Sequence, residues 1–168
     1  MSHMKHAAFK RPRAGFTIIE LLVSVAIIGI LASVAMPVVQ TQVQRQKEQQ
    51  LRAALMSIRS AIDAYKQAVV NGSIASQNVP SGYPPNLATL VAGVPTISNS
   101  QVQIYFLRSI PRDPFYPDQT TPASVTWALR SYEASDYIPP PGDGNGDVFD
   151  VQSMSTGVGL NGVPYSQW

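Results

Sequence analysis

The segment "RPRAGFTIIELLVSVAIIGILASVAMP", Arg11 to Pro37, decides how this chain is built. From Phe16 to Met36 it runs for 21 residues with one charged side chain, that of Glu20. A helix rises about 1.5 Å per residue, so a helical run of this length covers about 30 Å, the thickness of one hydrocarbon core. We therefore expect residues 16–37 to form a helix that crosses a membrane, in which the charge of Glu20 needs an explanation.

A short basic leader, residues 1–15, precedes this segment. It holds no acidic residue, and its positive charges are Lys5, Lys10, Arg11 and Arg13. Such a leader predicts that this end stays on the cytoplasmic side of the membrane. A secretory signal peptide has a shorter apolar core and a small-residue cleavage site, and the run into Pro37 lacks an Ala-x-Ala exit. Cleavage after the apolar segment is nevertheless an alternative, because the basic leader fits that pattern too.

The composition argues against an enzyme. There is no cysteine, and both histidines, His3 and His6, lie in the leader. Removal of the leader would leave no imidazole and no thiol, which excludes Ser-His-Asp and Cys-His catalysis and His-ligated metals. From Phe16 onward ten acidic residues outnumber eight basic ones. We expect no nucleic-acid partner, because the candidate basic patch, Arg45, Lys47, Arg52 and Arg59, is interleaved with Gln and Glu48 on a solvated helix face.

Glu20 has two physical explanations. A charge inside a membrane helix costs about 2.5 to 3.5 kcal/mol, and less near an end, where the side chain can reach the interface. An ordinary anchor with a snorkelling acid is therefore one explanation. Cleavage between Gly15 and Phe16 is the other, because it would create a positive α-amine that the Glu20 of a neighbouring subunit could meet in a low dielectric. That pairing would set the axial register between stacked helices.

The apolar period continues past Pro37 and predicts an amphipathic helix over residues 38–72. Its stripe, with Lys47 as the one polar break, is Val39, Val43, Leu51, Leu55, Ile58, Ile62, Tyr65 and Val69. The result is one helix of about 55 residues with Pro37 inside it, where proline removes a hydrogen bond and bends the axis. The alternative is that Pro37 ends the membrane helix and a second helix begins beyond it. Asn71-Gly72 should end the helix, since glycine adopts the left-handed conformation at little cost.

Residues 73–168 predict a small globular part. Ser73 to Pro85 reads as loop, and Asn86 is placed to cap a short helix over Leu87 to Ala92 that Gly93 closes. Residues 126–133 and 147–154 alternate as strands do, with Val148 or Phe149 setting the buried face, and "PPPGDGNGD" connects them as a hairpin. Trp168 is expected to pin the tail to the sheet. The fold class is α+β, a long helix packed on a short antiparallel sheet.

The stretch "RAGFTIIELLVSVAIIGILASVAMP" resembles the N-terminus of the type IV pilin and type II secretion pseudopilin class. In that class a prepilin peptidase cuts after the glycine, methylates the new N-terminal residue and leaves a glutamate at the fifth mature position. The resemblance implies cleavage after Gly15, methylation of Phe16, and assembly roles for Glu20 and Pro37. The apolar residues expected to be reburied between subunits are Val23, Ile27, Ile30, Leu31 and Val34, with Gly29, Ala32 and Ser33 allowing close approach.

Later motifs are similar to those of major pseudopilins. Tyr83-Pro84 stands before a short helix, and "IPRDPF", Ile110 to Phe115, fills the place of a Leu-Pro-x-Asp-Pro-aromatic segment. From the residues alone, Asp113 is expected to cap a turn through its carboxylate. The resemblance implies a homo-oligomeric filament in the periplasm that drives type II secretion, anchored by a single pass in the inner membrane. Its implied partners are a prepilin peptidase, an inner-membrane platform and minor pseudopilins.

Calcium is an open question. Many major pseudopilins hold calcium with Asp side chains in the C-terminal loop, whereas this chain has no acidic residue beyond Asp150. Asp143, Asn145 and Asp147 offer oxygens at alternate positions, as calcium loops do, but the bidentate Glu of an EF-hand is missing. We expect no other cofactor, and a plain hairpin turn is the alternative to a calcium loop.

Two rival functions follow from the same sequence. One is a type IV pilin or minor pilin that serves adhesion, motility or DNA uptake. The other is a membrane-anchored binding or enzymatic domain with a carboxylate-only site built from Asp113, Asp118 or Asp136.

Overall fold

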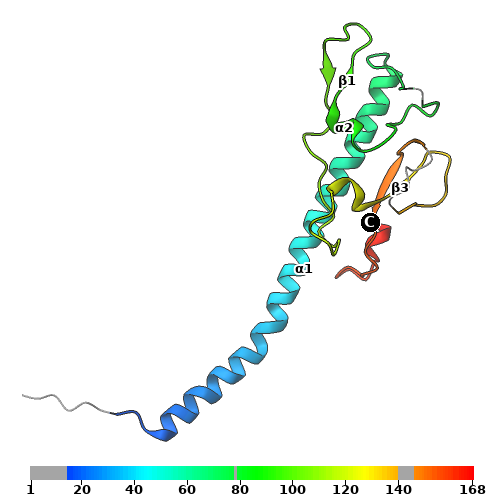
Figure 1. Cartoon of the computed structure of the whole chain (residues 1–168). Helices are drawn as coiled ribbons and strands as arrows, with labels where there is room; N and C mark the ends of the chain where they lie inside the picture. Colours follow the sequence, from blue (N-terminus) through cyan, green and yellow to red (C-terminus); the bar gives the residue numbers. More distant parts are fainter. Residues whose placement is uncertain (1–14, 78, 140–145) are drawn as a thin grey trace, which may run out of the picture. The chain divides into compact units, whose positions relative to one another are not determined.

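The computed structural model of the 168-residue chain describes residues 15–77, 79–139 and 146–168, without the side chains of residues 34–38. A single helix, α1 (Ile18–Val70), dominates it. The chain divides into a first unit that ends at Thr41 and a second that begins at Gln42, and α1 contributes to both. In the second unit the C-terminal part of α1 lies alongside short strands and loops (Figure 1). The fold is α+β, as predicted.

Local hydrogen bonds define both ends of α1. At the start, the Glu20 backbone N–H donates to Thr17 Oγ1 at 3.3 Å, so Thr17 caps the helix. At the end, Gly72 has φ of 67°. Its N–H donates to the Val69 carbonyl at 3.0 Å, and the Ser73 N–H donates to the Ala68 carbonyl at 2.9 Å. This is a Schellman motif, which confirms the stop predicted at Asn71-Gly72.

Pro37 lies inside α1 rather than at its end. The helix therefore runs on past it, which confirms the predicted single long helix and contradicts the alternative of a second helix that begins after Pro37. Proline has no backbone N–H, so the helix lacks one i→i−4 hydrogen bond at this position.

The apolar stripe of α1 forms one wall of the core. Its members at positions 51, 55, 58, 62 and 65 are all at most 2% exposed. Val39 and Val43 were expected in the same stripe but are 60% and 48% exposed. Gln44 hydrogen-bonds the C-terminal tail, at the Val158 carbonyl and the Tyr165 hydroxyl, and the fully buried part of the stripe begins beyond it, at Leu51.

Two small antiparallel sheets complete the second unit. β3 (Trp127–Arg130) pairs with β4 (Asp150–Ser153), with Trp127 opposite Ser153. Within β4 the buried residues are Val151 and Ser153, which alternate in phase with Phe149, while Val148 is buried just before the strand begins. β1 (Val94–Pro95) pairs with β2 (Gln103–Ile104), a hairpin that the sequence did not predict.

Short helices frame these sheets. α2 (Thr89–Ala92) is shorter than expected, although Asn86 Oδ1 accepts the Thr89 N–H at 3.0 Å as predicted. The 3-10 turn η1 (Ala123–Val125) lies before β3, and η3 (Tyr165–Gln167) lies near the end of the chain. The connection between β3 and β4 contains residues 140–145, which lie outside the described part of the chain.

No described helix contains a stretch that is both long and apolar enough to span a bilayer. The membrane-spanning character expected for residues 16–37 is therefore unconfirmed.

Candidate functional site

The first part of α1 carries a surface of exposed apolar side chains. They are between 51% and 82% exposed and occupy all sides of the helix: Phe16, Ile18, Ile19, Leu21, Leu22, Val23, Val25, Ile27, Ile28, Ile30 and Leu31. A helix that is apolar all round is stable only when other apolar material surrounds it. Exposed apolar patches of this extent mark sites of membrane or protein contact. We call this surface the apolar sleeve.

The predicted processing residues lie at the start of the sleeve. Gly15 and Phe16 are exposed and precede the first turn of α1, so the peptide bond between them lies in irregular backbone. Glu20 follows in the first turn, and Pro37 lies further along the same helix. No hydrogen bond or ion pair reaches the Glu20 carboxylate from any described residue.

Thr17 and Glu20 have a local relationship that sequence reasoning missed. They occupy the N-cap and N3 positions of α1, which is the spacing of a capping box. The Thr17 half of the box is formed. A carboxylate in the first turn is also favoured by the partial positive charge of the helix N-terminus. The Thr-x-x-Glu spacing in the sequence is the signal from which this capping box could have been predicted.

A buried carboxylate ties α1 to the C-terminal tail. Glu48 is 8% exposed, and its Oε1 accepts the Leu160 N–H at 2.8 Å, the Tyr165 hydroxyl at 3.0 Å and the Gln44 amide at 3.1 Å. Gln44 also donates to the Tyr165 hydroxyl oxygen at 3.0 Å. Lys47, expected on the buried stripe as its polar break, is exposed instead. Glu48, rather than Lys47, faces the tail. The three hydrogen-bond donors there compensate the free-energy cost of burying its carboxylate.

A second polar cluster joins α1 to β4. Arg59 Nε donates to Asp150 Oδ1 at 2.7 Å, and Arg59 Nη2 donates to the carbonyls of Val151 at 3.0 Å and Trp168 at 2.9 Å. The Tyr137 hydroxyl donates to Asp150 Oδ2 at 2.6 Å. Burial raises the pKa of Asp150, but hydrogen bonds from Tyr137, Arg59 and its neighbouring backbone N–H outweigh burial and leave the pKa below its ordinary value.

Asp113 is a structural residue. It is fully buried, its Oδ1 accepts the Phe115 N–H at 2.8 Å, and its Oδ2 accepts the Ser153 hydroxyl at 2.6 Å. The predicted turn cap is confirmed. Asp118 is exposed and accepts bonds from Thr120 and Thr121, which lower its pKa to about 2. Asp136 is also exposed. The carboxylate of Asp113 is therefore engaged inside the fold, whereas those of Asp118 and Asp136 face solvent.

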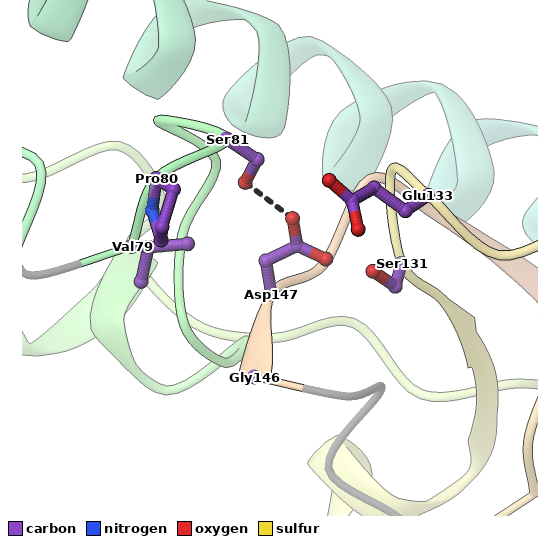
Figure 2. A pocket seen from close by; sticks show the side chains of 7 residues that line it. All are labelled: Val79, Pro80, Ser81, Ser131, Glu133, Gly146 and Asp147. Carbon is purple, nitrogen blue, oxygen red and sulfur yellow. Dashed lines mark hydrogen bonds between the residues drawn. The ribbon is translucent and has the colours of Figure 1, made fainter.

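Asp147 lies at a shallow pocket of about 380 Å³, lined by Val79, Pro80, Ser81, Ser131, Glu133, Gly146 and Asp147. Figure 2 shows its carboxylate directed at the Ser81 hydroxyl, which donates to Oδ2. Its Oδ1 accepts the Tyr132 N–H at 3.1 Å. Asp143 and Asn145, the other predicted calcium ligands, lie outside the described residues. Among the residues that the structure does describe, no group of three His, Cys, Asp or Glu side chains is placed to hold a metal.

Comparisons with known proteins find sequence similarity at the N-terminus of the chain. Residues 10–36 match the model of the prokaryotic N-terminal methylation motif. Over 50 residues the chain is 40% identical to the type IV major alpha-pilin of Moraxella bovis. The matched stretch is 30% of this chain and 31% of that protein. Over 57 residues it is 37% identical to type II secretion system core protein G of Pseudomonas aeruginosa, which covers 34% of this chain and 40% of that protein.

One similarity extends over nearly the whole chain. Core protein G of the type II secretion system of Vibrio cholerae is 26% identical over 159 residues, 90% of each chain. The first relatives are matched over only a third to two fifths of their own length. No solved structure gives a significant match.

Proposed function

We propose that this chain is a pseudopilin subunit that polymerises into a short periplasmic filament and so drives type II protein secretion. The observation that carries the proposal is the apolar sleeve directly behind an exposed Gly15-Phe16 bond, within a segment that matches the methylation motif. The relatives named core protein G support the secretion role, since one of them is similar along nine tenths of the chain.

The sleeve supplies the driving force for assembly. Burial of apolar surface yields about 25 cal/mol per Å². We propose that residues 16–37 first insert in the inner membrane as a single pass, with the globular part in the periplasm. Extraction from lipid is then tolerable only if the same side chains are covered by the sleeves of neighbouring copies. Each subunit thus exchanges a lipid environment for a protein one.

Processing prepares the charge partner of Glu20. We propose that a prepilin peptidase cuts after Gly15 and methylates Phe16, leaving a positive amine at the start of the helix. The Glu20 carboxylate of an adjoining copy then pairs with this amine in a low-dielectric setting, where the attraction is stronger than in water. Pro37 is proposed to act in assembly by weakening the helix at one point. An inner-membrane platform and minor pseudopilins are the proposed partners.

Intact-mass measurement on protein purified from its native host tests this proposal. The expected mass is that of residues 16–168 plus one methyl group. Glu20→Gln should abolish filaments while leaving insertion intact, and Gln50→Ala, on the exposed face of α1, is the control that should assemble normally. Filaments built from protein that still bears residues 1–15 would overturn the proposal.

A type IV pilin is the second candidate, favoured by the 40% identity to the Moraxella bovis alpha-pilin over 50 residues. The two candidates differ in the phenotype of a deletion strain. Loss of surface pili, adhesion, motility or DNA uptake with secretion intact would select the pilin. Accumulation of secreted enzymes in the periplasm with pili intact would select the pseudopilin.

Calcium binding by Asp143, Asn145 and Asp147 is proposed as a separate property. Asp147 supports it weakly, because both of its carboxylate oxygens already accept hydrogen bonds from the protein. Thermal unfolding of the full chain with excess calcium and with EGTA decides the matter. A midpoint that rises with calcium, and that no longer does so in Asp143→Asn, supports the site, whereas equal midpoints in both conditions reject it.

A further inference from the structure

The second unit contains a groove between α1 and the C-terminal tail. Its volume is about 370 Å³, and it is lined by Arg52, Leu55, Met56, Arg59, Asn161, Val163, Gln167 and Trp168. Met56 is 70% exposed in this groove, and the tail also exposes Val158 and Leu160 nearby in sequence. The groove thus combines open apolar surface with arginine side chains.

The arginines of the groove differ in their partners. Arg59 is tied to Asp150 and to two carbonyls, so its charge is used within the fold. Arg52 is exposed, and its guanidinium lies over the Trp168 ring at 4.3 Å. Arg45, one heptad earlier on α1, is exposed as well. Neither Arg45 nor Arg52 forms a salt bridge with any described residue, although both line a hollow on α1 that they share with Glu48.

A surface of complementary chemistry occurs elsewhere in the same unit. The loop from Tyr132 to Asp136 follows β3 and exposes two carboxylates, those of Glu133 and Asp136. Tyr132 is 56% exposed, and its ring stacks on that of Tyr83 with centroids 5.4 Å apart. Neither carboxylate forms a salt bridge within the described part of the chain. The loop is therefore acidic, aromatic and held in place.

Hydrogen bonds locate this loop along α1. Tyr132 donates its N–H to Asp147, Asp147 bonds Ser81, and the Ser81 carbonyl accepts a hydrogen bond from Lys66 Nζ at 2.6 Å. The loop is thus linked to the level of Lys66, whereas the groove begins at Arg52. At its other end the loop is followed by Tyr137, which donates to Asp150, and Asp150 also accepts a hydrogen bond from Arg59 of the groove. The two surfaces share no residue, so they are distinct.

We propose that the Tyr132–Asp136 loop of one copy docks into the Arg52–Trp168 groove of the next. The inference rests on the proposed function, because it supplies a contact between globular parts of neighbouring subunits. The occupant is argued from charge complementarity: the loop brings two carboxylates and an aromatic ring to a groove that holds Arg52, which has no salt-bridge partner among the described residues, beside exposed apolar side chains. Because the two surfaces differ, the contact is head-to-tail, and such contacts build open helical arrays rather than closed dimers.

Crosslinking in the native host tests the contact directly. A photoreactive phenylalanine analogue replaces Met56 in the full chain, and crosslinked peptides from isolated membranes and filaments are sequenced by mass spectrometry. We expect the groove to capture peptides that contain residues 131–137 of a second copy. Capture of another segment of this chain, capture of a different protein alone, or no crosslinked product would each overturn the proposal.

Charge reversal supplies the second measurement. Arg52→Glu and the pair Glu133→Arg with Asp136→Arg should each lower the yield of sheared filaments at least fivefold, and combining them should restore most of it. Arg108→Glu, which reverses an exposed arginine outside both surfaces, is the matched control and should assemble normally. Normal yields from both reversed variants would overturn the proposal. If the wild type forms no filaments, the proposed function fails, and the crosslink from position 56 alone decides the contact.

Discussion

The hydroxyl of Tyr165 donates a hydrogen bond of 3.0 Å to Glu48 Oε1, across 117 positions of the chain. The same oxygen accepts the Leu160 N–H, 112 positions away. One carboxylate on α1 thus holds two points of a glycine-rich tail. The tail ring of Tyr165 also stacks on Phe115, with centroids 4.1 Å apart, which fixes the hydroxyl in place.

Glu48→Ala should lower the free energy of unfolding by about 2 to 3 kcal/mol, because it leaves a buried hydroxyl and a backbone N–H without an acceptor. Chemical denaturation of the full chain in detergent measures the effect. Gln49→Ala, an exposed neighbour, should change it by less than about 0.5 kcal/mol. Equal losses in the two variants would show that the Glu48 contacts contribute nothing specific.

The lowered pKa of Asp150 predicts that the folded chain loses stability in acid. Its pKa lies below the ordinary value of 3.8 in the folded chain, so the ionised form is favoured by folding. The stability it contributes is fully present above pH 3.8 and is lost as the pH falls through the lower, folded pKa. Unfolding midpoints measured from about pH 6 to pH 2 should show this decline, and Asp150→Asn should flatten it. A variant with the same acid profile as the wild type would refute the assignment.

The raised pKa values of two tyrosines predict that the folded chain loses stability at high pH. Burial raises the pKa of Tyr65, and burial with a hydrogen bond to Asp150 raises that of Tyr137. A raised pKa means that folding favours the neutral phenol, so this stability is fully present below pH 10 and is lost as the pH rises through the folded values. Midpoints should therefore fall between about pH 10 and 12. Tyr137→Phe should make that fall shallower, whereas Tyr105→Phe, at an exposed position, should not.

A side chain at position 159 should clash with neighbouring residues of the tail. An added Cβ there would lie 2.5 Å from Trp168 Cζ2 and 2.7 Å from Asn161 Oδ1, closer than real contacts allow. Gly159→Ala should cost about 1 to 3 kcal/mol, because the indole must leave its place. Gly29→Ala meets nothing within 4 Å and serves as the control. Trp fluorescence during denaturation reports both stability and the surroundings of the ring.

Sequence patterns predicted the features that depend on near neighbours. The end of α1 at Gly72, the stripe from Leu51 to Tyr65 and the two strands of the β3–β4 hairpin each follow from residues a few positions apart. The β1–β2 pair was missed, because two-residue strands that include Pro95 carry no alternation to detect.

The polar contacts of the tail could not be predicted in the same way. Glu48 looks like one more solvated charge beside Lys47, and its burial is stabilised by donors more than a hundred positions away. The exposure of Val39 and Val43 has the same origin, since local periodicity cannot show where along α1 the packing partner begins. For the processing residues the situation is reversed. Gly15, Phe16 and Glu20 form a local motif, so the sequence carries their prediction and the folded globular part adds nothing to it.

The long reach of the Glu48 hydrogen bonds has a kinetic consequence. Closing a loop of more than a hundred residues is entropically costly, and folds that depend on such distant contacts form slowly. The helix α1, which carries Glu48, is synthesised early, whereas the tail that supplies hydrogen-bond donors to Glu48 is synthesised late. Until Leu160 and Tyr165 are synthesised, Glu48 lacks two of the three donors that it has in the folded chain, so this part of the core can close only after the tail is complete.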